Sequence, residues 1–441
     1  MIKTIVNAWK IADLRKKLIF TVLMVVVFRI GCAFPVPFVN ITDGILSDST
    51  ANNFMTYLSM MTGNAFNYGT LFAMSVTPYI NASIIIQLLT VAIPPLQKLS
   101  QEGEEGRKKM GKITRYSAAG LALMQSTAYY FYIKSQGFLT TDPKTGMAYT
   151  GFAGVFQAAV IILCYTAGAA FIIWLGDLIN EKGVGNGISI ILFAGIVSRI
   201  PTIIYQLYFA FNRGGKYYAL APIAAVILIL MIAYIVWMDN AERRIPVQYA
   251  KRVVGRKMYG GQSSHIPIKV NMCGVLPIIF ASSILSLPPT IGMFVPAKTA
   301  DSFWAKFLSW FNSDSVIYGI IYFILIIFFA YFYAAIQYNP IEMSNNIRNQ
   351  GGVIPGIRAG RPTSEFITRV LNRLTLLGAL LLSVVAVLPI VFTQVSKLIG
   401  AESMNISLGG TSIIIVVGVA LETVKQLESQ MMMRHYKGFL D

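Results

Sequence analysis

Charged residues are scarce in this sequence. Only 12% of its 441 residues are Asp, Glu, Lys or Arg, whereas a soluble domain carries about 25%. Hydrophobic residues make up 55% of the chain, and the mean hydropathy is strongly positive. This balance excludes a soluble globular protein and predicts a polytopic membrane protein. Because the first apolar run, residues 18–38, is long enough to be a span, we expect no cleavable signal peptide.

Residues that carry chemistry are also few. The three cysteines, Cys32, Cys164 and Cys273, fall in or beside apolar runs without metal-ligand spacing, so we expect packing residues and no disulfide. His265 and His435 are the only histidines. The sequence lacks the HExxH, GxSxG and P-loop motifs, and no apolar run holds paired carboxylates. We therefore expect neither an enzyme nor a bound cofactor or metal, and any energy must come from a partner.

Apolar runs that approach the roughly 20 residues of a membrane helix recur along the whole chain. We predict an all-α polytopic membrane protein with ten spans, near 18–38, 75–93, 114–134, 153–174, 186–209, 217–238, 271–292, 316–337, 372–392 and 410–428. Five spans precede residue 210 and five follow it. Because five is odd, the halves 1–209 and 210–441 would have opposite orientations, as in an inverted repeat, although their sequences show no obvious similarity.

Basic residues gather in alternate loops. The clusters lie at residues 3–17, 98–115, 243–269, 348–373 and 425–437, whereas residues 39–74 contain no lysine or arginine. The positive-inside rule then predicts that both termini are cytoplasmic and that the net charge of +17 is mostly cytoplasmic charge. Inside the predicted spans, Arg29 is the main ionisable residue. This scarcity argues against proton coupling but leaves open sodium sites made of carbonyl and hydroxyl groups.

The loop before the second span contains a broken apolar segment. Residues 54–74, FMTYLSMMTGNAFNYGTLFAM, are interrupted by Gly63, Asn64, Asn67 and Gly69. Irregular backbone at membrane depth survives only inside protein or beside a water-filled cavity. One interpretation is a re-entrant segment that enters a pore. The other, an amphipathic helix on the outer surface, is equally consistent with the residues.

Two spans carry aliphatic residues at helical spacing. Ile80 and Ile84 lie four residues apart in TPYINASIIIQLL, and Ile188 and Leu192 repeat the spacing in GNGISIILFAG. A ring of such side chains from several helices can close a pore by excluding water. The alternative is that they face lipid or pack against neighbouring helices, which is the commoner role of an isoleucine in a span.

The loop at residues 239–270 is basic and contains alternating segments. YAKRVV and SHIPIK predict a short hairpin, with Gly255 and the Gly260–Gly261 pair as candidate turns. Arginine and lysine on an ordered protrusion suit an acidic partner, either a phosphate backbone or an acidic protein face. Binding of anionic lipid together with topology setting is the alternative.

The loop at residues 338–371 contains GGVIPGIRAGRPT, a run of glycine, proline and arginine between two spans. Pro355 and Gly356 predict a tight turn, and Thr363 or Ser364 is the predicted cap of the next helix. We expect its arginines at the cytoplasmic surface, near the first basic loop if the two halves pack together.

Five motifs resemble one family closely: TPYINASIIIQLL, GVGNGISIILFAGIV, PVQYAKR, SSHIPIKVNMCGVLPIIFASSI and PGIRAGRPT. In this order they resemble the SecY family, the channel subunit of the bacterial Sec protein translocase, over essentially the whole chain. The resemblance implies an hourglass pore in the cytoplasmic membrane, formed by two five-helix halves that open like a clamshell. Signal sequences and membrane segments would leave sideways between the second and seventh spans.

The resemblance also implies roles for particular residues. The pore ring would be Ile80, Ile84, Ile188, Leu192, Ile279 and Ile415, with leucine at 192 where isoleucine is common. The broken segment around residues 57–70, with Gly63, Asn64, Asn67 and Gly69, would be the plug, a re-entrant helix. The motor ATPase SecA and the ribosome would bind Arg243, Lys251, Arg252, Arg256, Lys257, Arg358 and Arg361. Lysine at 257 replaces a frequent arginine, and it lacks the bidentate fork.

The resemblance implies a channel for signal peptides and unfolded nascent chains. SecE would brace the halves and SecG would be peripheral, with membrane lipids, a membrane insertase and SecDF-type proteins as further partners. Three rival classes fit less well. A sodium-coupled solute transporter predicts a midplane site and small cytoplasmic loops, and an intramembrane enzyme needs a dyad or metal ligands. A structural scaffold leaves the broken outer segment unexplained.

Overall fold

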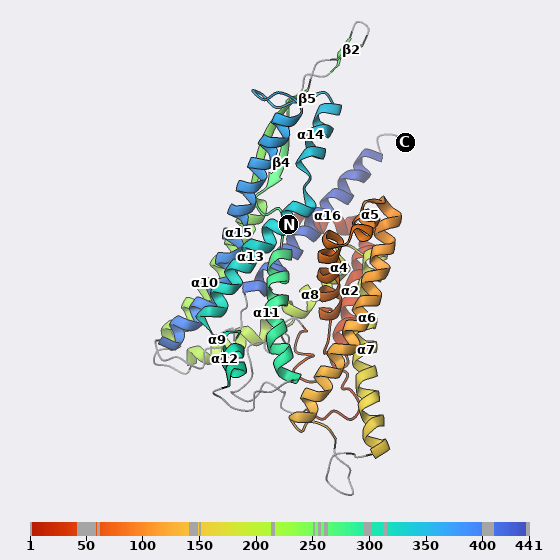
Figure 1. Ribbon diagram of the computed structural model, residues 1–441, viewed down its shortest axis with the longest axis vertical. Helices are drawn as coiled ribbons and strands as arrows, with labels where there is room; N and C mark the ends of the chain where they lie inside the picture. Colours follow the sequence, from red (N-terminus) through yellow and green to blue (C-terminus); the bar gives the residue numbers. More distant parts are fainter. Residues whose placement is uncertain are drawn as a thin grey trace.

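The structure is a computed structural model, and it is built mainly from long helices (Figure 1). It describes residues 2–41, 59, 62–140, 149, 151–212, 217–249, 252–254, 257–259, 263–294, 302–311, 315–398 and 410–437. The helices of the N-terminal part are α1 (Ile2–Lys10), α2 (Ala12–Gly31), α4 (Thr77–Ala92), α5 (Pro94–Gln101), α6 (Gly103–Ser135), α7 (Gly151–Lys182), α8 (Gly187–Val197) and α9 (Ile200–Asn212). The later helices are α10 (Tyr217–Asn240), α11 (Leu276–Phe294), α12 (Phe303–Trp310), α13 (Val316–Gln337), α14 (Pro340–Asn349), α15 (Arg361–Leu398) and α16 (Gly410–Lys437).

Each of the ten predicted spans falls on a helix or a broken helix, but some ends differ. The first span was predicted to reach residue 38, whereas α2 ends at Gly31, ahead of Pro35 and Pro37. The fifth span is divided into α8 and α9, with Pro201 just after the break. By length and composition, six helices of the described residues are able to cross a membrane, or seven if α4 and α5, bent by 108°, form one span.

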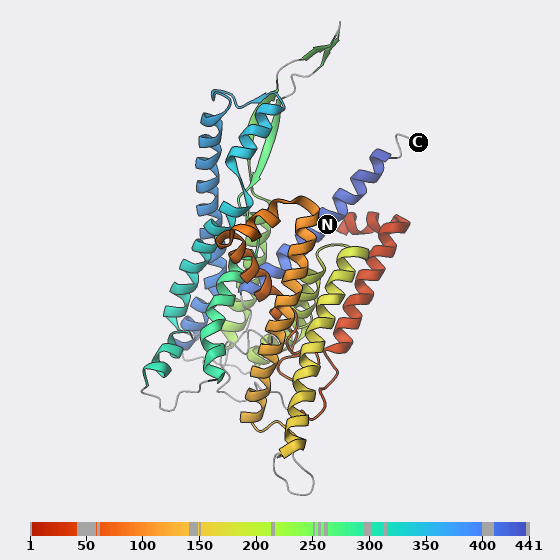
Figure 2. The ribbon, with the colours of Figure 1, turned by 45° about the vertical axis from the view of Figure 1, so that its right-hand side comes forward.

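The helices form two groups that lie side by side. In Figures 1 and 2 the helices α2, α4, α6, α7 and α8 lie together, and α10, α11, α13 and α15 lie beside them. Contacts of α8 with α16 and of α6 with α11 join the groups. This grouping accords with a division near residue 210; the exact boundary and the inverted repeat stay predictions.

The ends of the helices carry a small sheet in the order β4–β1–β5. Strand β1 (Glu242–Tyr249) pairs antiparallel with β4 (Ser263–Lys269), so that Ile245 faces Ile266. The hairpin prediction was right for SHIPIK but wrong for its partner, because ERRIPVQY alternates with Ile245 and Val247 buried. The YAKRVV segment instead supplies β2 (Arg252–Val254), which pairs with β3 (Lys257–Tyr259). Gly255, Gly260 and Gly261 lie outside the described residues.

Helices α7 and α8 cross at a contact that only glycine permits. A Cβ at Gly187 would lie 2.0 Å from the carbonyl oxygen of Gly176. Asn186 caps α8, because its side chain accepts hydrogen bonds from the backbone N–H groups of Ile188 and Ser189. The backbone N–H of Gly187 donates to the Asn180 side chain at 2.8 Å. The GNGIS motif therefore sets the position of α8 and of the aliphatic residues along it.

We predict that Gly187→Ala destabilises the protein by about 1–3 kcal/mol, because the added methyl group forces α7 and α8 apart. Gly120→Ala is the matched control, since nothing lies within 4 Å of a Cβ at that position. In the control, loss of glycine flexibility inside α6 should raise stability by about 0.5–1 kcal/mol. The check is the thermal unfolding temperature of each detergent-solubilised variant. Equal unfolding temperatures would contradict the close crossing.

Candidate functional site

The six predicted ring residues lie in or against two neighbouring apolar clusters. Leu192 and Ile415 are buried in a cluster formed mainly by α2, α7, α8 and α16, and Ile80, Ile188 and Ile279 pack against it. Ile84 is buried in the second cluster, formed mainly by α10, α11, α13, α15 and α16. Ile80 and Ile279 pack against both clusters. The six residues come from four separate helices, and Ile80 and Ile279 link the two clusters. A single ring formed by all six stays a prediction.

Val275 belongs to the same contact but was missed by sequence reasoning. It packs against both clusters, as Ile80 and Ile279 do. The backbone N–H of Ile279 donates to the Val275 carbonyl at 3.2 Å, which places the two residues one helical turn apart. The four-residue spacing between them was the available signal. All seven side chains are hydrocarbon and offer no hydrogen-bonding group. Ile84, Leu192 and Ile415 are buried, and the other four are half-buried.

The predicted plug residues lie in a run of turns rather than in a helix. Residues 62–76 form this run, and residues 57, 58, 60 and 61 lie outside the described part of the chain. Gly63, Asn64 and Gly69 have φ angles of 62°, 76° and 58°. These left-handed values favour glycine and asparagine, which explains the residues that interrupt the apolar segment. Asn67 lies in the same run and is half-buried.

The turn segment is buried among helices, and side chains satisfy its backbone. The Tyr129 hydroxyl donates to the carbonyl of Phe66, and the Tyr165 hydroxyl donates to the carbonyl of Gly69 at 3.0 Å. Arg29 Nη1 lies 3.5 Å from the Gly63 carbonyl oxygen, at the limit of a hydrogen bond. Buried irregular backbone with internal partners fits the re-entrant interpretation, and for residues 62–76 it contradicts a helix on the outer surface.

The two tyrosines were not predicted from the sequence. They are separated from their acceptors by 63 and 96 residues, so no local pattern links them. Both rings are buried and stack edge-on against each other, with centroids 5.1 Å apart. A buried tyrosine hydroxyl needs a partner, and here the partner is the backbone of the turn segment.

The two basic loops form one unit, because the second loop adds a strand to the sheet of the first. Strand β5 (Gly352–Val353) pairs antiparallel with β1, joining Gln248 to Val353 and Tyr249 to Gly352. Both loops belong to the C-terminal part of the chain, so their proximity does not depend on how the two halves pack. Ile245, Val247, Ile268, Ile347 and Ile354 form a shared core beneath the sheet.

Residues 354–360, called the arginine loop because they include Arg358, are held in place by hydrogen bonds to their backbone. The Thr363 hydroxyl donates to the Arg358 carbonyl at 2.8 Å, and the Ser344 hydroxyl donates to the Gly360 carbonyl at 2.9 Å. The predicted cap was wrong: α15 begins at Arg361, and Thr363 turns back onto the loop instead of preceding the helix. Gly356 and Gly360 have φ angles of 81° and 102°, so the predicted turn at Pro355 and Gly356 requires glycine there.

The predicted basic residues are distributed over this unit. Arg243 and Arg358 are exposed, and exposed Arg361 pairs with Glu365 at 3.1 Å. Arg252 and Lys257 lie on β2 and β3, where only the backbone is described, and Lys251 and Arg256 lie outside the described residues. In Figure 1 the sheet lies beside α14 and the start of α15, and the β2–β3 pair projects beyond them.

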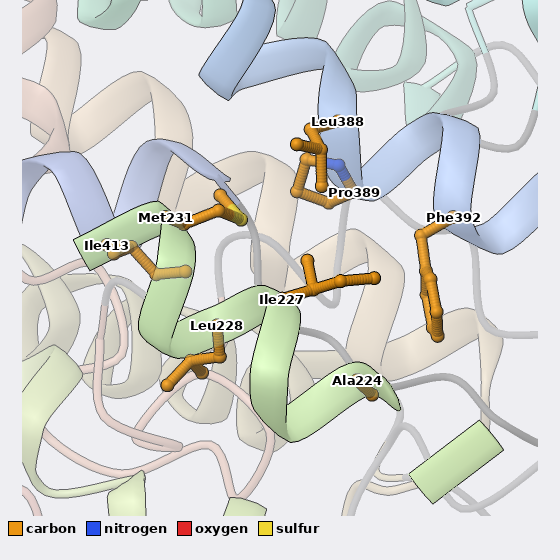
Figure 3. A pocket seen from close by; sticks show the side chains of 8 residues that line it. All are labelled: Ala224, Ile227, Leu228, Met231, Leu388, Pro389, Phe392 and Ile413. Atoms are coloured by element: carbon orange, nitrogen blue, oxygen red, sulfur yellow. The ribbon is translucent and has the colours of Figure 1, made fainter. Parts of the chain in front are cut away.

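An apolar recess lies between α10, α15 and α16 (Figure 3). Its volume is only about 30 Å³, and its lining residues are Ala224, Ile227, Leu228, Met231, Leu388, Pro389, Phe392 and Ile413. These side chains offer no charge and no strong hydrogen-bonding group that could fix the orientation of a polar solute. The recess therefore does not support a solute transporter. Among the described residues there is also no group of three His, Cys, Asp or Glu side chains placed to hold a metal.

The SecY family profile matches residues 70–424. Over 450 aligned residues, covering 100% of both chains, the sequence is 41% identical to the protein translocase subunit SecY of Mycobacterium tuberculosis. This chain belongs to the SecY family. It is therefore a multi-pass membrane protein, the protein-conducting channel subunit of a translocase, and not an enzyme.

Solved structures share the fold at low sequence identity. A structure described as a protein conducting channel is similar, with a TM-score of 0.62, 17% identity and coverage of 95% of this chain and 92% of that one. Sec61 in a canine ribosome-channel complex from the endoplasmic reticulum has a TM-score of 0.61, 16% identity and the same coverage of 95% and 92%. At such identities the likeness establishes the fold of this SecY family member and leaves its residue roles to be tested.

We predict that Ile80→Asn or Ile279→Asn lets water into the closed contact. An amide there, without a partner, destabilises the dry state by about 1–3 kcal/mol. The variants should leak ions and accept precursors with defective signals, as measured by ion flux and translocation in proteoliposomes. Ile85→Asn, on the exposed side of α4, is the matched control. Ring variants that leak no more than the parent and still reject defective signals would overturn the ring assignment.

We predict that Tyr165→Phe destabilises the protein by about 1–3 kcal/mol, because the Gly69 carbonyl is left buried without its donor. Tyr116→Phe is the matched control, since Tyr116 is 79% exposed on α6. Thermal unfolding in detergent compares the two. If both variants unfold at the temperature of the parent, the tyrosine does not hold the turn segment.

Proposed function

We propose that this channel carries signal-bearing unfolded polypeptides across the bacterial cytoplasmic membrane and releases membrane segments laterally into it. The observation that carries the proposal is that Ile80 and Ile279 pack against the apolar clusters of both helix groups, while Ile84, Ile188, Leu192 and Ile415 lie in or against one of them. Such a contact closes the path by excluding water. It gives way to a passing chain without binding it, since hydrocarbon forms no hydrogen bond to a peptide.

The gate would lie between α4 and α11. These two helices carry Ile80, Ile84 and Ile279, so separating them opens the contact directly. The apolar core of a signal peptide that inserts there gains about 0.8 kcal/mol for each buried CH₂ group. Binding of this kind shifts a two-state channel towards its open state. Residues 57–70, which overlap the turn segment, would act as the plug on the other side of the ring.

The proposed orientation places the sheet and both termini in the cytoplasm. Helix α1 and the far end of α16 lie towards the same end of the bundle as the sheet (Figure 2). The basic clusters around α5 and the start of α6 are at this end as well. The positive-inside rule assigns such an end to the cytoplasm.

The sheet would be the docking platform for SecA or the ribosome. Arg243 lies on β1, Arg358 and Arg361 follow β5, and the pairing of the two strands fixes these arginines on one body. Arginine matches phosphate and carboxylate groups bidentately, as both kinds of partner require. Similarity to a channel seen in a ribosome complex supports this role. Within the same proposal SecE braces the halves, SecG is peripheral, and a membrane insertase and SecDF-type proteins are accessory partners.

We predict that Arg358→Glu abolishes ATP-dependent translocation by replacing a cation on the platform with a repelling anion. The measurement is protection of a signal-bearing precursor from protease in proteoliposomes that contain this protein, SecE and SecA. Arg369→Glu is the matched control, because Arg369 is exposed two turns along α15.

The three possible outcomes distinguish the site of motor coupling from the channel function itself. Protection by the parent and by Arg369→Glu, with loss in Arg358→Glu, supports motor coupling through the arginine loop. Protection by every variant supports the channel function but indicates that motor coupling depends on residues 243–257 instead of Arg358. Protection by none, with SecA bound and active, contradicts the proposed channel function.

A further inference from the structure

The sheet is joined to the helices by two short connections that meet at its base. Ala241 alone separates α10 from β1, and residues 270–275 link β4 to α11. The backbone N–H of Val270 donates to the Ala241 carbonyl at 2.9 Å, so the pairing of β1 with β4 continues into both connections. A displacement of the sheet therefore reaches α10 and α11 through this base.

A hydrogen bond between a carboxylate and an amide closes the base of the sheet. The side-chain N–H of Asn271 donates to the Asp239 carboxylate at 2.7 Å, and it joins the last turn of α10 to the connection that leads to α11. Asn271 is buried and Asp239 is half-buried. Hydrogen bonds to an ionised acceptor are stronger than those between neutral groups, so this contact favours one fixed geometry.

The connection 270–275 is packed against two further helices. Cys273 is buried in the core beneath the sheet, and its thiol donates to the Ala330 carbonyl of α13 at 3.3 Å. A Cβ at Gly378 of α15 would lie 2.4 Å from the carbonyl oxygen of Val270. Because a close-packed segment transmits a displacement instead of absorbing it, movement of the base acts on the start of α11.

The same hydrogen bond adjoins residues of the predicted ring. A Cβ at Gly418 of α16 would lie 3.0 Å from the Val275 side chain and 3.9 Å from an Asp239 carboxylate oxygen. Gly418 stands three residues after Ile415, and the Val275 carbonyl accepts from the backbone N–H of Ile279. The carboxylate and amide therefore lie between the sheet and two helices that carry predicted ring residues.

We propose that Asp239 and Asn271 are positioning residues that couple the sheet to the predicted ring. While their hydrogen bond is formed, a partner that binds the sheet moves α10 and the start of α11 as one body, and Ile279 follows. Without the bond the sheet moves relative to α11, and opening no longer follows binding. The inference rests on the proposed function, because it takes docking on the sheet and separation of α4 from α11 as given.

Exchange of the two side chains separates coupling from simple stabilisation. Asn271→Asp places two carboxylates at the contact, which repel each other at neutral pH. Adding Asp239→Asn to this variant restores one carboxylate and one amide in reversed order, and with them the hydrogen bond. Asp239→Ala removes the acceptor without adding a charge, and it decides the test if Asn271→Asp does not fold.

Asn240→Asp is the matched control. It makes the same chemical change on the residue next to Asp239, but the Asn240 side chain donates to the Val236 carbonyl of its own helix, at 3.0 Å, and is exposed. The added charge is therefore similar in place, while the bond between Asp239 and Asn271 is kept.

The measurement is the distance between α4 and α11 in the full-length protein, reconstituted with SecE in lipid nanodiscs. Spin labels at Ile85→Cys and Leu287→Cys, which are 43% and 53% exposed, report this distance by pulsed dipolar spectroscopy. Cys32 and Cys164 are replaced by alanine, and Cys273 is kept because it is buried. Each variant is measured with and without SecA, ATP and a signal-bearing precursor. The affinity for SecA and the unfolding temperature are measured on the same samples.

We expect the parent and Asn240→Asp to gain a longer distance when SecA, ATP and precursor are added. Asn271→Asp and Asp239→Ala should bind SecA with the affinity of the parent, but the ratio of open to closed channels should fall by about tenfold, within the range over which residues between coupled sites change an equilibrium. The reversed pair should restore the ratio. A merely stabilising pair would not separate binding from opening in this way.

Three results would overturn the inference. If Asn271→Asp and Asp239→Ala open as the parent does, the pair is not needed for coupling, and the proposed function stands. If the reversed pair opens no more than Asn271→Asp, the two residues do not act through their hydrogen bond. If the parent binds SecA without any separation of α4 from α11, the proposed gate itself is contradicted, and the inference with it.

Discussion

In the proposed channel, the closed path depends on an apolar contact that must exclude water and yet hold nothing that passes through it. Ile80 and Ile279 suit this proposed role, since they pack against the clusters of both helix groups and their side chains carry no polar atom. Hydrocarbon closure of this kind opens when the helices separate, without breaking a hydrogen bond or an ion pair. Hydrogen bonds from side chains to the backbone lie elsewhere. They hold the turn segment 62–76 and the loop that carries Arg358 in place.

A second constraint shapes the rest of the bundle: backbone inside a membrane must find its hydrogen bonds within the protein. The turn segment meets it by using the hydroxyls of Tyr129 and Tyr165. Helix α15 faces the same problem at Pro389, which has no N–H for the carbonyl of Val385. Helix α16 begins at Gly410 against that carbonyl, so closely that a Cβ at Gly410 would come within 2.4 Å of its oxygen.

Much of the fold could be predicted, because a span needs a long apolar run and such runs are visible in sequence. The predicted ends failed where proline intervenes, as after Gly31. Strand β1 was not predicted, because only Ile245 and Val247 alternate as buried apolar residues. Arg243, Arg244 and Pro246 beside them are not typical of a strand. Strand β5 has two residues and leaves no pattern at all. The ring residues were predicted from the resemblance to the family, since helical spacing identifies a shared face but not what the face contacts. The tyrosine contacts depend on tertiary structure alone.

We propose that polypeptide passes through the contact between the two helix groups. The most direct measurement places a photoreactive amino acid at Leu192 or Ile415, both buried at this contact, or at Leu230, which is 62% exposed on α10. A precursor is then arrested midway through translocation and the sample is irradiated. The account predicts crosslinks to the precursor from 192 and 415, dependent on SecA and ATP, and none from 230. Crosslinks from 230 without any from 192 or 415 would contradict it, because the chain would then pass outside the proposed ring.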